Sequence, residues 1–358
     1  MSKRLHPVAW WAWALGLATA ASPVTNPWLL ALIVAVAGFV VAARRGPEPW
    51  SDAYKVFLRL GLLAIGIRLL FHLVLGGVEG PTVLIGLPQL TLPDWLSGIR
   101  IGGPVTAEGA LAALYDGLRL AVLLGCVGAA NALASPRRLV RSMPAALYEV
   151  SVAVVVALSM APQLVASTKR VNRARTLRGD TDRGPRHLLR AVVAPVLHDA
   201  LDRSLALAAA MDTRGYGRPG TVSKTARRLT AALMLTGVLG MCVGAYGLLA
   251  RESTGLTGGL FLALGGALAV TGIVLAARRV PRTRYRPDPF GWREWAVTLS
   301  GAVAAGAVIA TQALDPGVLN PPVTPLSVPG LPLYAALGVL AATLPAWIAP
   351  DPNKEAAR

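Results

Sequence analysis

The sequence predicts an all-α polytopic membrane protein with about eight transmembrane helices and additional amphipathic helices in the cytoplasm. Its 358 residues are 54% hydrophobic and only 15% charged, whereas about a quarter of the residues of a soluble domain are charged. The mean hydropathy is +0.55. Apolar runs long enough to cross a bilayer recur along the chain, which is too long to bury them all in one soluble core.

Eight apolar runs are expected to cross the membrane, because a spanning helix needs about 20 predominantly apolar residues. The first is short for a span, and Trp10, Trp11 and Trp13 are expected to anchor it at the interface. The predicted spans are 8–21, 27–43, 56–76, 109–134, 229–250, 257–277, 295–312 and 332–349.

The basic residues orient these spans, since cytoplasmic loops of membrane proteins collect Lys and Arg. Lys3 and Arg4 place the N-terminus in the cytoplasm, and Lys354 and Arg358 place the C-terminus there as well. We therefore expect a multi-pass protein of the plasma membrane with both termini inside the cell. Four basic residues lie elsewhere, in outside loops or within spans: Arg100, Arg251, Arg68 and Arg119.

A ninth apolar run, 144–166, is predicted not to cross. If it crossed, segment 167–228 would lie outside the cell, and that segment holds fourteen Lys and Arg residues. Such an arrangement would strongly contradict the bias of basic residues toward the cytoplasm. Glu149 and Pro162 also favour a helix that lies along the membrane or dips into it. The chain then divides into three segments: 1–143 with four spans, 144–228 in the cytoplasm, and 229–358 with four spans.

The cytoplasmic segment is expected to contain two helices after the apolar run. The first covers Ser167–Arg178 and ends at Gly179-Asp180, and the second covers 186–214 with a kink at Pro195. Apolar residues recur along the second helix at spacings of three or four, which is typical of an amphipathic helix. This stripe consists of Leu197, Leu201, Leu205, Ala208 and Met211.

Both cytoplasmic helices are predicted to end in the same way, with Arg directly before Gly. Gly179 and Gly215 are expected to take the left-handed conformation that closes a helix, because glycine has no Cβ to clash. Arg178 and Arg214 are favoured there by the helix dipole, by ~0.3–1 kcal/mol each. One such end is explained by helix termination alone. Two of them present guanidinium groups at rigid tips, where they suit carboxylates of a partner.

These two ends resemble the paired Ala-Arg-Gly signatures of the transmembrane T component (EcfT/CbiQ family) of energy-coupling-factor ABC transporters. Leu177 and Thr213 stand where the signatures have Ala before Arg. Three Pro-containing elements are also similar, and the resemblance covers roughly residues 1–220. The matching elements are Ala174-Arg175-Thr176-Leu177-Arg178-Gly179, Ala210-Met211-Asp212-Thr213-Arg214-Gly215-Tyr216-Gly217, Leu5-His6-Pro7, Thr25-Asn26-Pro27 and Ser135-Pro136.

The resemblance implies a membrane scaffold rather than a catalyst. Such a subunit holds two cytoplasmic ABC-type ATPases through its coupling helices and a small substrate-capturing membrane subunit through its apolar surfaces, among membrane lipids. ATPase closure then drives uptake of a vitamin or transition-metal ion. Run 144–166 would be the first coupling helix. The residues implied to contact the ATPases are Ala174, Arg175, Arg178, Gly179, Ala210, Met211, Asp212, Arg214, Gly215 and Tyr216.

Enzyme and nucleic-acid functions find little support in the sequence. The nearest match to a phosphate loop, Gly220–Thr225, lacks the Gly before Lys224, so no ATPase activity is expected. An integral-membrane transferase would need clustered Asp for Mg²⁺, and Arg203 can pair with Asp199 or Asp202 instead. The net charge of +17 is explained by cytoplasmic loops. We expect no cofactor, no bound metal and no nucleic-acid partner.

Two arginines within predicted spans leave a stand-alone transporter or channel as the main alternative, because charges inside the membrane are functional candidates. Arg68 and Arg119 could instead extend along their helices toward the membrane surface, or pair with Asp116, Glu108 or Glu79. Arg119 is about one helical turn from Asp116, so we expect these two to pair with each other.

Overall fold

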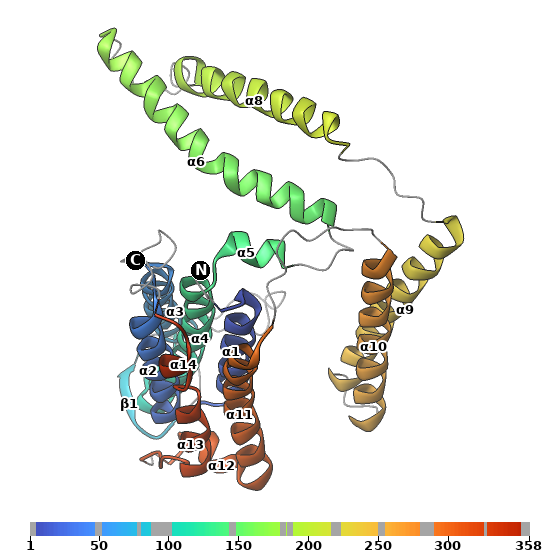
Figure 1. Ribbon diagram of the computed structural model, residues 1–358. Coiled ribbons are helices and arrows are strands. Elements are labelled where there is room, and N and C mark those ends of the chain that lie inside the picture. Colours follow the sequence, from blue (N-terminus) through green and yellow to red (C-terminus); the bar gives the residue numbers. More distant parts are fainter. Residues whose placement is uncertain are drawn as a thin grey trace, which may run out of the picture. The chain divides into compact units, whose positions relative to one another are not determined.

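The computed structural model describes residues 5–46, 52–76, 80–86, 102–142, 148–179, 184, 189–215, 223–249, 255–279, 290–325 and 328–351. The chain separates into two compact units (Figure 1). The first unit combines Met1–Leu139 with Pro287–Arg358, so the two ends of the chain build one body. The second unit is the intervening segment, Val140–Arg286.

The first unit is a bundle of helices with one short β-hairpin. Helix α1 packs on α11, α3 packs on α4, and α13 packs on both α11 and α2. Strands β1 and β2 are antiparallel, with Val83 opposite Thr106 and an irregularity in the register before Ile85. The elements are α1 (Pro7–Ala21), α2 (Pro27–Arg44), α3 (Ala53–Leu75), β1 (Val83–Gly86), β2 (Pro104–Thr106), α4 (Ala107–Leu133), α11 (Trp292–Leu314), α12 (Pro316–Leu319), α13 (Leu333–Ala341) and α14 (Pro345–Ile348). The short helix α5 (Pro136–Arg141) contains the boundary between the two units, after Leu139.

The dipeptide His6-Pro7 begins α1, and the dipeptide Asn26-Pro27 begins α2. In each, the residue before proline caps the helix: His6 Nδ1 accepts from the amide of Val8 at 3.3 Å, and Asn26 Oδ1 accepts from that of Trp28 at 3.0 Å. Proline then occupies the first helical position, where its missing N–H is not needed. Asn26 is fully buried and also donates to the carbonyl of Val318 at 3.0 Å, so it joins the start of α2 to α12.

The core of the first unit forms where α1 meets the C-terminal helices. A Cβ added to Gly16 would lie 2.5 Å from backbone atoms of Gly301, so the two helices touch through glycine backbones. Trp13 and Leu17 of α1 are fully buried in this core. The Trp13 indole N–H donates to the carbonyl of Ala342 at 3.0 Å, which satisfies its polar atom within the apolar interior.

The second unit contains two helix pairs. One pair is α6 (Tyr148–Leu177) with α8 (Ala194–Thr213), joined by a π-helical turn at Leu189–Val193 that leads into α8. The other is α9 (Lys224–Leu249) with α10 (Gly255–Arg279). This second pair also touches through glycines. A Cβ at Gly237 or Gly265 would lie 2.5 Å from the backbone of the opposite helix, an approach that small residues permit between membrane helices.

The structure confirms the predicted fold class. Within the described residues, seven helices are long and apolar enough to cross a membrane: α2, α3, α4, α6, α9, α10 and α11. Six of the eight predicted spans correspond to helices of this set. The predicted span 8–21 is the shorter helix α1, of 15 residues. The three-segment division of the chain stays a prediction.

Two predicted elements differ in detail from the structure. The predicted span 332–349 is not one helix, because α13 ends at Ala341 and a turn leads to Pro345 at the start of α14. Run 144–166 and the helix Ser167–Arg178, predicted as separate elements, belong to one helix, since α6 is continuous over 30 residues. Pro162 lies inside α6 without ending it. By length and composition α6 could also cross a membrane, so its predicted position along the membrane stays a prediction.

Candidate functional site

The ends of α6 and α8 adopt the predicted left-handed closure. Gly179 has a φ of 75° and Gly215 a φ of 76°. Their amides donate to main-chain carbonyls three residues earlier: Gly179 to Thr176 at 3.1 Å, and Gly215 to Asp212 at 2.9 Å. The two ends therefore share one backbone geometry, as their sequences predicted.

Both arginines at these ends are exposed. Within the described part of the chain, the guanidinium groups of Arg178 and Arg214 make no hydrogen bond and no ion pair. Leu177, beside Arg178, is 82% exposed. Both tips are thus accessible to a partner. Of the other predicted contact residues, Ala174, Ala210 and Asp212 are exposed, Arg175 and Met211 are half-buried, and Tyr216 lies outside the described residues.

A polar cluster joins α6 to α8, which run in opposite directions (Figure 1). The hydroxyl of Ser167 donates to Asp199 Oδ2 at 2.7 Å, and Ser167 is 3% exposed. Arg203 forms an ion pair with Asp199 at 2.9 Å and reaches Gln163 Oε1 at 3.5 Å. We call Gln163, Ser167, Asp199 and Arg203 the helix clamp. The pair of Asp199 with Arg203 is one of the ion pairs that the sequence suggests. The hydrogen bonds of Ser167 and Gln163 are not among the predicted contacts.

The helix clamp favours the charged form of Asp199. The hydrogen bond from Ser167 lowers the pKa of the Asp199 carboxyl below its ordinary value, and the positive charges of Arg203 and Arg170 lower it further. Partial loss of solvent acts in the opposite direction but is outweighed. Asp199 is therefore ionised at neutral pH and holds Ser167 and Arg203 in place.

The predicted apolar stripe of α8 is exposed, because the helix contacts α6 through its polar edge. Leu197, Leu201 and Leu205 are 56%, 59% and 67% exposed. An exposed row of leucines is typical of a surface that contacts lipid or another protein. The stripe is thus available for a membrane or subunit contact.

Helix α6 changes character along its length. From Val150 to Ala166 it carries no charged residue, and from Ser167 to Arg178 it carries basic residues but no acidic ones. The basic residues are Lys169, Arg170, Arg173, Arg175 and Arg178. The basic half ends at the Arg178 tip, so positive charge is concentrated where a partner would approach.

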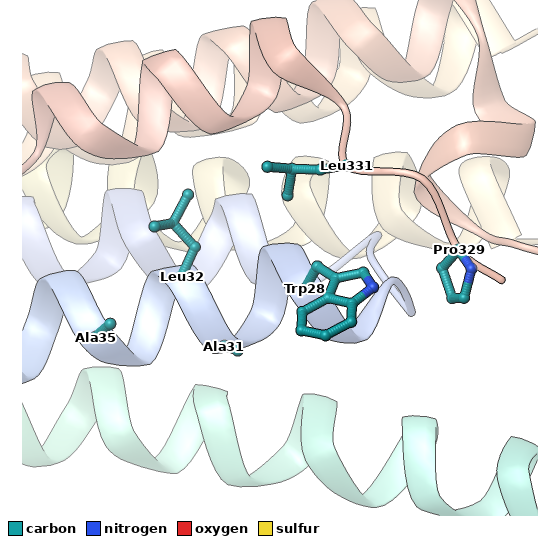
Figure 2. A pocket seen from close by; sticks show the side chains of 6 residues that line it. All are labelled: Trp28, Ala31, Leu32, Ala35, Pro329 and Leu331. Carbon is teal, nitrogen blue, oxygen red and sulfur yellow. The ribbon is translucent and has the colours of Figure 1, made fainter.

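An apolar groove of about 440 Å³ opens on the first unit, between α2 and the loop before α13 (Figure 2). Figure 2 shows Trp28 and Pro329 at one end of the groove and Ala35 at the other. None of the lining side chains is ionisable, so the groove offers apolar contact rather than chemistry. The lining residues are Trp28, Ala31, Leu32, Ala35, Pro329 and Leu331.

The intramembrane charges pair differently from the prediction. Asp116 of α4 forms an ion pair with Arg68 of α3 at 2.7 Å, across the interface of the two helices. The expected pair of Asp116 with Arg119 is therefore wrong. Gly117 explains the preference: a Cβ there would lie 3.0 Å from Cα of Ile65, so α3 comes close enough for Arg68 to reach Asp116.

Apolar helices of membrane-spanning length define a polytopic membrane protein, and two exposed Arg-Gly helix ends form its candidate docking site. The chain belongs to the CbiQ cobalt transport protein family, whose model matches residues 1–225. The predicted resemblance is thereby confirmed, and the protein is a membrane transport component. No curated protein and no solved structure matches the chain. The family match ends at the start of α9, so α9, α10 and the later helices lie beyond it.

Proposed function

We propose that this chain is the membrane scaffold subunit of an energy-coupling-factor ABC importer. In this role it binds two ABC-type ATPases and a small substrate-capturing membrane subunit, among the lipids of the plasma membrane, with both of its termini in the cytoplasm. The main supporting observation is that α6 and α8 end in the same exposed Arg-Gly geometry. The family name points to cobalt, so a transition-metal ion or a vitamin is the proposed cargo.

The proposed mechanism assigns a role to the helix ends, the helix clamp and the leucine stripe in turn. Arg178 and Arg214 each bind carboxylates on one ATPase, because a guanidinium offers a planar fork of donors. ATPase closure then displaces the two helix ends. The helix clamp keeps α6 and α8 together during this movement. The exposed leucine stripe of α8 passes the movement to the membrane-embedded partner.

The chain itself is proposed to be non-catalytic, with ATP hydrolysis in the partner ATPases. The main enzyme alternative, a transferase, needs free Asp carboxylates to hold Mg²⁺. Asp199 is instead engaged by Ser167 and Arg203, which argues against that alternative. Mg²⁺-dependent turnover by the purified chain would contradict our proposal, as would substrate flux through the chain alone in liposomes.

The decisive experiment is purification of the tagged chain from its native membrane in mild detergent, followed by mass spectrometry. We expect two ABC-type ATPases and a small apolar membrane protein with the wild type. In a variant with both Arg178→Glu and Arg214→Glu, ATPase recovery should fall about tenfold or more, because the new glutamates repel the ATPase carboxylates. Its abundance in the membrane should be unchanged.

The matched control is Arg173→Glu, which reverses an exposed charge on α6 away from its tip. It should retain the ATPases. Equal ATPase recovery from the double variant and the wild type would show that the helix ends are not the docking points. Repeated recovery of the wild type alone, in more than one detergent, would contradict the scaffold function itself.

A further inference from the structure

Arg119 lies at the centre of a membrane helix. Helix α4 has 27 residues, so its length is about 40 Å, which exceeds the ~30 Å hydrocarbon core. The midpoint of α4 is Leu120, and Arg119 is its neighbour. About 18 Å of helix separates Arg119 from Ala107 and about 21 Å separates it from Leu133. With the middle of α4 at the middle of the bilayer, about 15 Å of hydrocarbon separates Arg119 from the headgroups on either side, which is more than the length of an arginine side chain.

Arg119 has no anionic partner within the described residues, where it makes no hydrogen bond and no ion pair. The nearest carboxylate along α4 is Asp116, one turn away, and Asp116 is held by Arg68 at 2.7 Å. The group formed by Arg68, Asp116 and Arg119 therefore carries a net charge of about +1.

The remaining membrane helices of the chain offer no carboxylate at this depth. Apart from Asp116, the seven candidate spanning helices contain only three acidic residues: Glu108, Glu149 and Glu294. Each lies in the first turn of its helix, far from the middle of the membrane. Glu108 also accepts a hydrogen bond from Thr82 at 2.6 Å, and Glu294 accepts one from the amide of Gly291 at 3.0 Å. Within the described part of the chain, no carboxylate is placed to neutralise Arg119, which leaves room for a counter-charge from another molecule.

The surface around Arg68 and Asp116 is open and otherwise apolar, and Arg119 is half-buried beside it. The side chains of Arg68 and Asp116 are 49% and 43% exposed. Phe71, one turn from Arg68, is 54% exposed, and Leu120, one turn from Asp116, is 48% exposed. A half-exposed ion pair and an uncompensated arginine are unfavourable against lipid tails, whereas flanking apolar side chains suit the packing of another helix.

We propose that the surface of α4 that carries Asp116, Arg119 and Leu120 binds a transmembrane helix of another subunit, and that this helix carries an Asp or Glu at mid-membrane depth. The partner is the substrate-capturing subunit, and this identification rests on the proposed function. A carboxylate there neutralises Arg119 and completes a four-charge group with Arg68 and Asp116. The surrounding apolar side chains pack against the same helix.

The test compares Arg119→Leu with the wild type in the native-membrane purification, following the ATPases and the small membrane protein separately. We expect recovery of the small membrane protein to fall about tenfold or more, because its buried carboxylate loses its partner. ATPase recovery should be unchanged. The matched control is Arg59→Leu, which removes an exposed arginine near the start of α3 and should leave both recoveries unchanged.

A charge exchange separates lost contact from lost folding. Arg119→Glu should release the small membrane protein, and changing the acidic residue of its hydrophobic segment to Arg should restore its recovery. Full retention by Arg119→Leu, or a partner without an intramembrane acidic residue, would overturn the inference while leaving the ATPase scaffold intact. A change in anion flux through Arg119→Leu in liposomes would also overturn it, in favour of an anion pathway. Absence of ATPases from the wild type would instead contradict the proposed function.

Discussion

Single residues fix the shape of the two helix ends. Gly179 and Gly215 have positive φ values, and no atom lies within 4 Å of a Cβ added to Gly179. A side chain at Gly179 would therefore meet no neighbour, and its unfavourable effect would come from the backbone conformation alone. For an L-residue other than Asn or Asp, this conformation costs about 1–2 kcal/mol.

Replacing both glycines by Ala should therefore distort the tips and weaken ATPase binding. We expect about fivefold or greater loss of ATPase recovery from Gly179→Ala with Gly215→Ala. The measurement is quantitative mass spectrometry of the purified complex. Replacement by Asn is the control, since Asn tolerates the left-handed region, and it should retain more ATPase than Ala does. Wild-type recovery with Ala would show that the tip conformation is not needed for docking.

At the scale of residues, the sequence predicts those features that depend only on neighbours along the chain. The glycine conformations follow from helix termination, which involves only neighbours along the chain. The helix clamp was only partly predictable, because Ser167 and Asp199 meet through the crossing of two helices. The ion pair of Asp116 with Arg68, rather than with Arg119, likewise depends on the packing of two helices. Sequence spacing favoured the neighbour on the same helix, whereas the close approach at Gly117 brought α3 within reach.

At the scale of elements, the helix clamp is the contact on which coordinated movement of α6 and α8 depends. Asp199→Asn removes the charge that holds Arg203 while keeping the size of the side chain. We expect ATPases to remain bound, because Arg178 and Arg214 are unchanged, whereas ATP-driven uptake falls severalfold. The measurements are ATPase recovery and substrate uptake in reconstituted vesicles. Asp202→Asn, on an exposed residue of α8 outside the clamp, is the matched control.

The same contact should depend on pH in a defined direction. The folded pKa of Asp199 lies below the ordinary value of about 3.9, so the clamp is fully formed above that value. It weakens as the pH falls through the lower folded pKa. Spin labels at Thr168 and Leu205 should report a broader distance distribution in acid for the wild type. Asp199→Asn should show the broad distribution at every pH, and a pH-independent wild type would contradict the role of this carboxylate.

The element boundaries show where prediction succeeded and why it failed elsewhere. Helices α2, α9, α10 and α11 follow directly from apolar runs of spanning length. The continuity of α6 through Pro162 was not predictable, because a proline removes one hydrogen bond but neighbouring turns decide whether the helix ends. Conversely, Pro345 does begin a new helix after α13.

At the scale of the whole molecule, the membrane topology depends on whether α6 crosses. In a chain whose Cys126 and Cys242 are replaced by Ala, a cysteine at Ser223 should react with an impermeant thiol reagent only after the cells are permeabilised. Val328→Cys, which is 91% exposed in a loop predicted to lie outside, should react in intact cells and serves as the control. Reaction of the Ser223 cysteine in intact cells would place α6 across the membrane and reverse the predicted arrangement.

The overall fold class follows from composition and hydropathy, but the assembly of the helices does not. Nothing in the apolar runs indicates that α1 packs on α11, since both helices are apolar on most sides. That pairing depends on Gly16 and Gly301 meeting at the crossing, a match between positions that single-helix patterns do not show. The family match ends at the start of α9, so the family resemblance offered no guide to the later helices either.

The first and last parts of the chain form one unit, so α1 is synthesised long before the C-terminal helices on which it packs. Ribosomes add about 5–20 residues per second, so roughly 15–60 s pass between synthesis of α1 and synthesis of α11. During that interval Trp13 and Leu17 lack the helices that later bury them. The newly inserted α1 is also short for a stable span. The nascent protein therefore depends on the insertion machinery or surrounding lipid to hold α1, and products truncated before α11 should be prone to proteolysis.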